Sequence, residues 1–93
     1  MSKVGVHLKI EGRVQGVGFR YFCQKKALDN SIRGEVKNLS NGNVEIIAEG
    51  DQIKIDHFIH VLKNDHPYAN VTHIEKKNME YTGKYKDFKI VFY

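Results

Sequence analysis

Residues 4–27 read VGVHLKIEGRVQGVGFRYFCQKKA, and within this stretch the spacing of the apolar side chains changes once. The first part has an apolar residue at every second position: Val4, Val6, Leu8 and Ile10. This period of two predicts a strand with one buried face. The second part has the i, i+3, i+4, i+8 spacing of an amphipathic helix: Phe19, Phe22, Cys23 and Ala27. Residues 12–18 contain three glycines, and we expect no regular element there.

The middle of the chain continues with two strands and a helix. Alternating apolar residues predict strands over residues 32–37 and 44–48, and Asn41-Gly42 between them is typical of a type I′ hairpin turn. Asp51 is expected to be the N-cap of the second helix, and His66-Pro67 to end it. The apolar stripe of this helix is Ile55, Phe58, Ile59 and Leu62.

The last third predicts two more strands, one over residues 71–74, whose end the pattern leaves open as far as Tyr81, and one over residues 88–92. The order is therefore β-α-β-β-α-β with a short C-terminal strand. The economical packing is an α+β ferredoxin-like sandwich, a mostly antiparallel sheet with two helices on one face. Polar residues at the alternate strand positions fit a sheet whose other face is wet.

Length and composition favour one small domain. The 93 residues predict a single domain over residues 1–93. The one cysteine cannot form an internal disulfide, which suits a cytoplasmic protein. Residues 1–5 contain no apolar h-region, and no apolar run approaches the roughly 18 residues of a membrane span, so we expect neither secretion by a signal peptide nor membrane insertion. The net charge of +4 favours an anionic ligand, although the C-terminal lysines are mixed with acids, as on a solvated surface.

The glycine-rich loop and the start of the following helix resemble an anion site. Glycines allow several backbone N–H groups to point at one centre, and a helix N-terminus adds unpaired N–H groups and partial positive charge. No Ser, Thr, Asp or Asn precedes Phe19, and the first turn contains Arg20 and no acid. A cation is unfavourable there unless an anion binds beside it. The alternative is an ordinary loop with an exposed arginine.

Asn38 follows Ile32, Gly34 and Val36 at every second position of its strand, so its side chain is expected to point inward, as theirs do. An amide on an apolar phase must find hydrogen-bond partners or serve a site. Both a functional role and a turn residue bonded to the hairpin backbone remain open.

These segments together resemble the acylphosphatase family over the whole chain. The first signature is Gly12-Arg13-Val14-Gln15-Gly16-Val17-Gly18-Phe19-Arg20. The second is Gly34, Val36, Asn38, Gly42, Val44 and Gly50, and the ending Phe88-Lys89-Ile90 is also similar. One departure is Glu35, where the family usually has an aromatic residue. Because Glu35 is on the outward phase of its strand, we expect altered surface packing and no lost site.

The resemblance implies the hydrolysis of small acyl phosphates. It implies that Arg20 and loop amides of Gln15, Gly16, Val17, Gly18 and Phe19 bind the phosphoryl group, and that Asn38 orients the attacking water. The leaving carboxylate has a reference pKa of about 4, so no general acid is required. We therefore expect no metal and no cofactor. We also expect no nucleic-acid or membrane partner and, because no long exposed apolar patch is evident in the sequence, a monomer.

Four other groups of residues are considered as functional sites and are not proposed as such. Cys23 is on an apolar helix stripe, so it is expected to pack in the core rather than act as a nucleophile. His57, His60 and His66 are too few for a zinc site and fit a solvated face. Asp51 is expected to be a cap rather than a base, and Ser40 belongs to the hairpin turn.

Three rival functions remain. Residues 15–22 faintly resemble the RNP1 motif of RNA-recognition domains, but such aromatic residues must stack bases from a central strand. Similar domains also begin larger hydrogenase-maturation carbamoyltransferases, although a free-standing chain of 93 residues does not favour this role. The third rival is a protein that binds phosphate without turnover.

Overall fold

The computed structural model describes residues 2–92 and has the predicted order of elements. The strands are β1 (Lys3–Arg13), β2 (Arg33–Asn38), β3 (Val44–Asp51), β4 (Asn70–Met79) and β5 (Phe88–Ile90). The helices are α1 (Phe19–Asp29) and α2 (Gln52–Asn64). None of the helices among these residues is long and apolar enough to cross a membrane.

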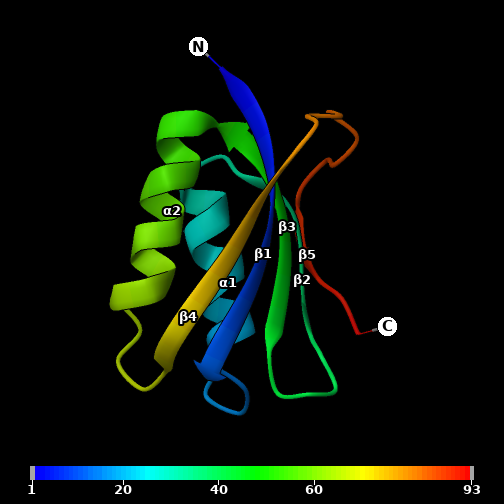
Figure 1. Cartoon of the computed structure of the whole chain (residues 1–93). Helices are drawn as coiled ribbons and strands as arrows, with labels where there is room; N and C mark the ends of the chain where they lie inside the picture. Colours follow the sequence, from blue (N-terminus) through cyan, green and yellow to red (C-terminus); the bar gives the residue numbers. More distant parts are fainter. Residues whose placement is uncertain (1, 93) are drawn as a thin grey trace.

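The five strands form one sheet in the order β4-β1-β3-β2-β5, and both helices cover the same face (Figure 1). All neighbouring strands are antiparallel except β2 and β5, which are parallel. This arrangement confirms the predicted ferredoxin-like sandwich.

The core lies between the sheet and the two helices. The inward positions of β1 pair with inward positions of β3, for example Leu8 with Ile46 and Ile10 with Val44. Phe19, Cys23 and Ala27 are the buried residues of α1. The buried residues of α2 are Ile55, Phe58, Val61 and Leu62, with Ile59 partly buried. Both predicted stripes therefore face the sheet.

The first strand is longer than the sequence predicts. The glycine-rich stretch was expected to be irregular from residue 12, but Gly12 and Arg13 belong to β1 and pair with Val71 and Asn70 of β4. The register shifts between Glu11 and Gly12, and Gly12 has a φ of 124°. A bulge of this kind interrupts the alternation of side chains, which hides the end of the strand from a pattern of period two.

The hairpin between β2 and β3 is confirmed, but its predicted type I′ turn is wrong. A type I′ turn needs positive φ at both central residues. Gly42 has a φ of 94°, whereas Asn41 is not in the positive region. The loop is wider: the Leu39 N–H donates to the Asn43 carbonyl at 2.8 Å, and the Gly42 N–H donates to the Leu39 carbonyl at 3.2 Å.

Asp51 occupies the N-cap position of α2, but the predicted capping bond is absent, since its side chain makes no cap hydrogen bond. Asp51 is also the last residue of β3, and its carboxylate lies 3.7 Å from the Lys3 ammonium. The strand therefore passes directly into the helix, and the carboxylate is turned toward β1.

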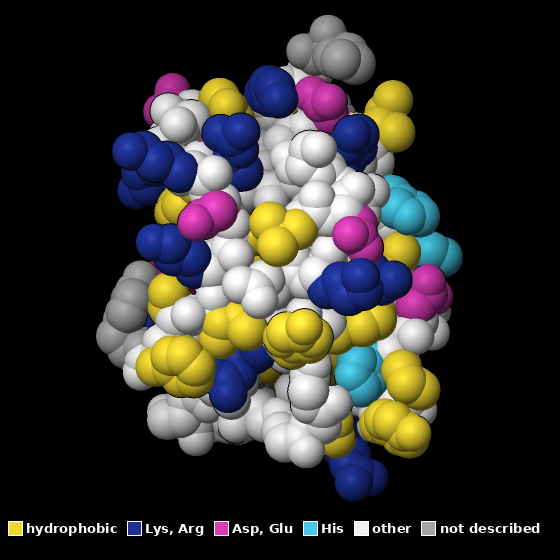
Figure 2. All heavy atoms as spheres, turned by 180° about the vertical axis from the view of Figure 1, so that it is seen from behind, with side chains coloured by type: hydrophobic (Ala, Val, Ile, Leu, Met, Phe, Trp, Pro, Cys, Tyr) yellow, Lys and Arg dark blue, Asp and Glu magenta, His cyan; other side chains and the backbone are white. Residues whose placement is uncertain are grey.

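The surface carries charges of both signs. In Figure 2, Lys and Arg side chains are spread over the visible face with Asp and Glu among them. Glu35 lies on the outward phase as predicted, because its neighbours Gly34 and Val36 are both buried.

Candidate active site

The loop of residues 14–18 joins the end of β1 to the start of α1. Gly16 and Gly18 have φ values of 75° and 74°, and Gly18 is the N-cap of the helix. A Cβ at either glycine would meet no atom within 4 Å, so a larger side chain would not clash there. Glycine is required because the backbone is left-handed at both positions. Alternating left-handed residues turn successive N–H groups to one side, which is the geometry of an anion nest.

The two ends of the loop are held by buried side chains. Val14 and Phe19 are each 1% exposed and belong to the core. The amide of Gln15 donates two further hydrogen bonds, to the carbonyls of Leu39 at 2.9 Å and Asn43 at 2.8 Å. These bonds join the loop to the β2–β3 hairpin. The side-chain donors of Gln15 are therefore used within the protein, whereas its predicted part in phosphate binding concerns the loop amides.

Arg20 lies in the first turn of α1, where the helix has no acidic residue and no side-chain cap. The helix N-terminus therefore presents its unpaired N–H groups together with a guanidinium. The guanidinium carbon of Arg20 lies 4.9 Å from the centre of the Phe92 ring, in cation–π contact. No carboxylate within residues 2–92 forms an ion pair with Arg20, which leaves its N–H groups available to an anion.

Asn38 is the last residue of β2 and pairs with Val44 of β3. Its Oδ1 atom is buried and accepts no hydrogen bond from any described residue. Buried amide oxygens normally have a donor, so an unpaired one on a residue that lines a cavity indicates that a ligand or a water is the missing partner. This observation favours the functional reading of Asn38 over a turn residue bonded to the hairpin.

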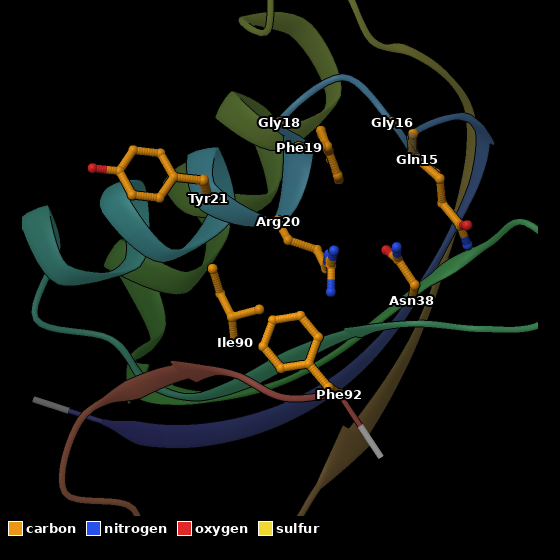
Figure 3. Close-up of a pocket in the computed structure, with 10 residues that line it drawn as sticks. Gln15, Gly16, Gly18, Phe19, Arg20, Tyr21, Asn38, Ile90 and Phe92 are labelled. Carbon is orange, nitrogen blue, oxygen red and sulfur yellow. The ribbon is translucent and has the colours of Figure 1, made fainter.

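These residues share one cavity of about 200 Å³ (Figure 3). It is lined by Val14, Gln15, Gly16, Gly18, Phe19, Arg20, Tyr21, Asn38, Ile90 and Phe92. Figure 3 shows Arg20 and Asn38 pointing into the same space from α1 and β2. Of the predicted site residues, Val17 is not part of this lining and packs against the core instead.

Sequence reasoning missed the contribution of the C-terminal segment. Ile90 and Phe92 line the cavity because β5 pairs in parallel with β2, so that Ile90 lies opposite Val36. The alternation of Phe88, Ile90 and Phe92 shows a common face. The alternation does not show which strand pairs with β5. The neighbouring strand decides whether these side chains lie next to the cavity.

Two of the residues set aside earlier, Cys23 and His66, have structural roles. Cys23 is fully buried, and burial raises the pKa of its thiol, which disfavours the nucleophilic thiolate. The Nδ1 atom of His66 accepts the N–H groups of Tyr68 and Ala69 at 3.1 and 2.9 Å. Among the described residues, no three His, Cys, Asp or Glu side chains gather as metal ligands.

The RNP1-like stretch does not occupy the position that RNA stacking needs. Residues 15–22 lie in the loop and in α1, and the ring of Phe19 is buried in the core. An RNA-recognition motif presents its aromatic rings from a central strand of the sheet. The cavity instead combines backbone N–H groups, one guanidinium and one unpaired amide oxygen, a set that fits a small oxyanion and a water.

Comparisons with known proteins identify relatives that span nearly the whole chain. The acylphosphatase family model matches residues 6–90. An acylphosphatase of Caldanaerobacter subterraneus subsp. tengcongensis is 47% identical over 88 residues, which cover 95% of this chain and 98% of that protein. The crystal structure of acylphosphatase from Bacillus subtilis has a TM-score of 0.90 at 39% identity, covering 95% of this chain and 98% of that one.

The same fold also occurs inside a much longer protein. Full-length HypF, in a phosphate- and nucleotide-bound crystal structure, matches 97% of this chain with a TM-score of 0.84 and 32% identity, but the match covers 12% of HypF. The family model and the curated relatives span nearly the whole chain. The chain therefore belongs to the acylphosphatase family of enzymes.

Proposed function

We propose that this enzyme cleaves the carboxyl–phosphate bond of acyl phosphates without a metal, by in-line attack of a water that Asn38 orients. Family membership supports acyl phosphate hydrolysis as the reaction. The observation that supports the residue roles is that one cavity is lined both by Asn38, whose Oδ1 atom is buried and unpaired, and by Arg20.

The phosphoryl group binds at the loop and the start of α1. Backbone N–H groups of the loop and the planar guanidinium of Arg20 hold its oxygens. Phosphoryl transfer depends mainly on positioning and on stabilising the charge of these oxygens. Since Val14, Phe19 and the hydrogen bonds of Gln15 fix the loop, its donors are already in place before the substrate arrives.

The water attacks phosphorus opposite the acyl oxygen. It donates a hydrogen bond to the Oδ1 atom of Asn38, which leaves an oxygen lone pair free for the phosphorus. The new P–O bond forms as the P–O bond to the acyl group breaks, and the electron pair leaves with the carboxylate. The extra proton ends on the phosphate product or in solvent.

The leaving group supports a reaction without metal or general acid. A carboxylate leaves readily because its conjugate acid has a pKa of about 4. The charge that a divalent ion would neutralise in other phosphoryl transfers is met here by Arg20 and the N–H groups of the loop. We further propose that the substrate is a small acyl phosphate, which suits a cavity of about 200 Å³, and that the chain acts as a cytoplasmic, single-domain monomer.

The test is the hydrolysis of benzoyl phosphate in EDTA by the wild type and by three variants. Loss of one preorganised contact often costs a factor of about 10²–10³ in rate, so we expect this loss for Arg20→Ala and Asn38→Ala with the fold retained. Arg20→Lys should also fail, because an ammonium does not replace the planar fork. Wild-type turnover by folded Arg20→Ala would refute the mechanism, and phosphate binding without turnover by the wild type would favour a binding protein.

A further inference from the structure

The cavity has two chemically different sides. Gly16, Gly18, Arg20 and Asn38 line the polar side, whereas Ile90 and Phe92 form an apolar side contributed by the C-terminal segment. Figure 3 shows the Phe92 ring next to the Arg20 guanidinium, while the ring of Tyr21 points away from it. The proposed phosphoryl contacts use the polar side alone, so they leave Phe92 without a role in the reaction.

The sheet holds Phe92 at this place. Ile90 lies opposite Val36, and the Val91 N–H donates to the Val36 carbonyl at 2.9 Å. Asn38 follows Val36 by two residues on the same face of β2, so this pairing sets the end of the chain beside Asn38. The Phe92 ring nevertheless remains 82% exposed, which means that it does not serve the core.

The charges around the cavity limit the groups that can lie on this side. Among the described residues that line it, Arg20 is the one charged side chain, and the proposed reaction assigns it to the phosphoryl group. A second negative charge on the acyl group would therefore find no cation of its own in the lining. An aromatic or aliphatic acyl group would instead find the rings and methyl groups of Phe92 and Ile90.

From these observations we propose that Phe92, together with Ile90, is the contact surface for the acyl part of the substrate. The enzyme then prefers uncharged aromatic or apolar acyl phosphates to short or anionic ones. This inference rests on the hydrolysis proposed above. Phe92 acts as a specificity residue, because it touches the part of the substrate that does not react.

The experiment compares kcat/KM for benzoyl phosphate and acetyl phosphate in the chain of residues 1–93. An aromatic pair typically contributes enough to change binding by about two- to tenfold, so Phe92→Ala should lower the benzoyl-to-acetyl ratio by that factor. The loss of the cation–π contact with Arg20 would affect both substrates alike and cancel in the ratio. Phe92→Leu keeps an apolar side chain and should lower the ratio less than Phe92→Ala.

Ile53→Ala is the matched control, because Ile53 is 83% exposed and lies on α2 outside the cavity lining. It should leave the ratio unchanged. An unchanged ratio in Phe92→Ala, with both substrates hydrolysed, would overturn the proposed acyl contact and leave the hydrolysis standing. Absence of turnover of both substrates by the wild type would instead refute the proposed function itself.

Discussion

Gln15 offers a sharp test of how the site is assembled. Its side-chain amide donates to the carbonyls of Leu39 and Asn43, one at each end of the hairpin loop that follows Asn38. We predict that Gln15→Met, which keeps the length of the side chain and removes both donors, lowers stability and also lowers kcat. The second effect follows because the hairpin carries Asn38, and a misplacement of about 1 Å can cost a factor of roughly 10² in rate.

The stability effect can be estimated from the hydrogen bonds. Each is worth about 0.5–1.5 kcal/mol, which gives about 1–3 kcal/mol for the pair. Neither carbonyl loses every donor in the variant. The Leu39 carbonyl keeps the N–H of Gly42, and the Asn43 carbonyl keeps the N–H of Leu39. No additional penalty for an unpaired buried oxygen is therefore expected. A domain of this size loses about 4–8 °C of melting temperature per kcal/mol.

The assay combines thermal unfolding with kcat for acetyl phosphate, measured well below the melting temperature. Gln24→Met is the control, since Gln24 donates a single hydrogen bond, to the Phe88 carbonyl at 3.0 Å, away from the hairpin. We expect it to lose about half as much stability and to keep its kcat within about twofold. If Gln15→Met keeps full kcat, or loses no more stability than Gln24→Met, the two hydrogen bonds of Gln15 do not position Asn38.

Three further predictions concern packing and pH. Gly34→Ala should cost more than about 3 kcal/mol in urea unfolding, because φ is 149° and the new Cβ would lie 1.8 Å from the Ile47 carbonyl oxygen; Gly42→Ala, with no atom within 4 Å, should cost about 1–2 kcal/mol. The Cys23 thiol should react with a disulfide reagent at the rate of unfolding, and rapid labelling of the native protein would contradict its burial. The hydrogen bond with His7 holds the pKa of Glu45 below its usual value. This stabilisation is present above the unfolded-state pKa of about 4.3 and is lost as the pH falls through the lower, folded-state value, so Glu45→Gln should make the loss of stability in acid less steep.

The order of the elements, and two residues that line the cavity, Arg20 and Asn38, could be predicted from local pattern. A change of apolar period from two to 3.6 marks where a strand gives way to a helix, and it located β1 and α1 because the buried face of each element repeats along the chain. Arg20 stood out by being a cation at a helix start, and Asn38 by being an amide on an inward phase. Both signals are local, since each compares one residue with its neighbours in sequence.

Other features depend on contacts that no local pattern contains. The end of β1 lies past a bulge that its pairing with β4 stabilises, and the turn type of the hairpin follows from the bonds of Leu39 and Asn43. The hydrogen bonds of Gln15 to the hairpin and the cation–π contact of Arg20 with Phe92 join segments that are distant in sequence. The sequence by itself therefore determined the elements, the fold class and the polar half of the site. The tertiary structure decided how the loop is fixed and which side chains line the apolar side of the cavity, because the hydrogen bonds of Gln15 and the pairing of β5 with β2 join segments that are distant in sequence.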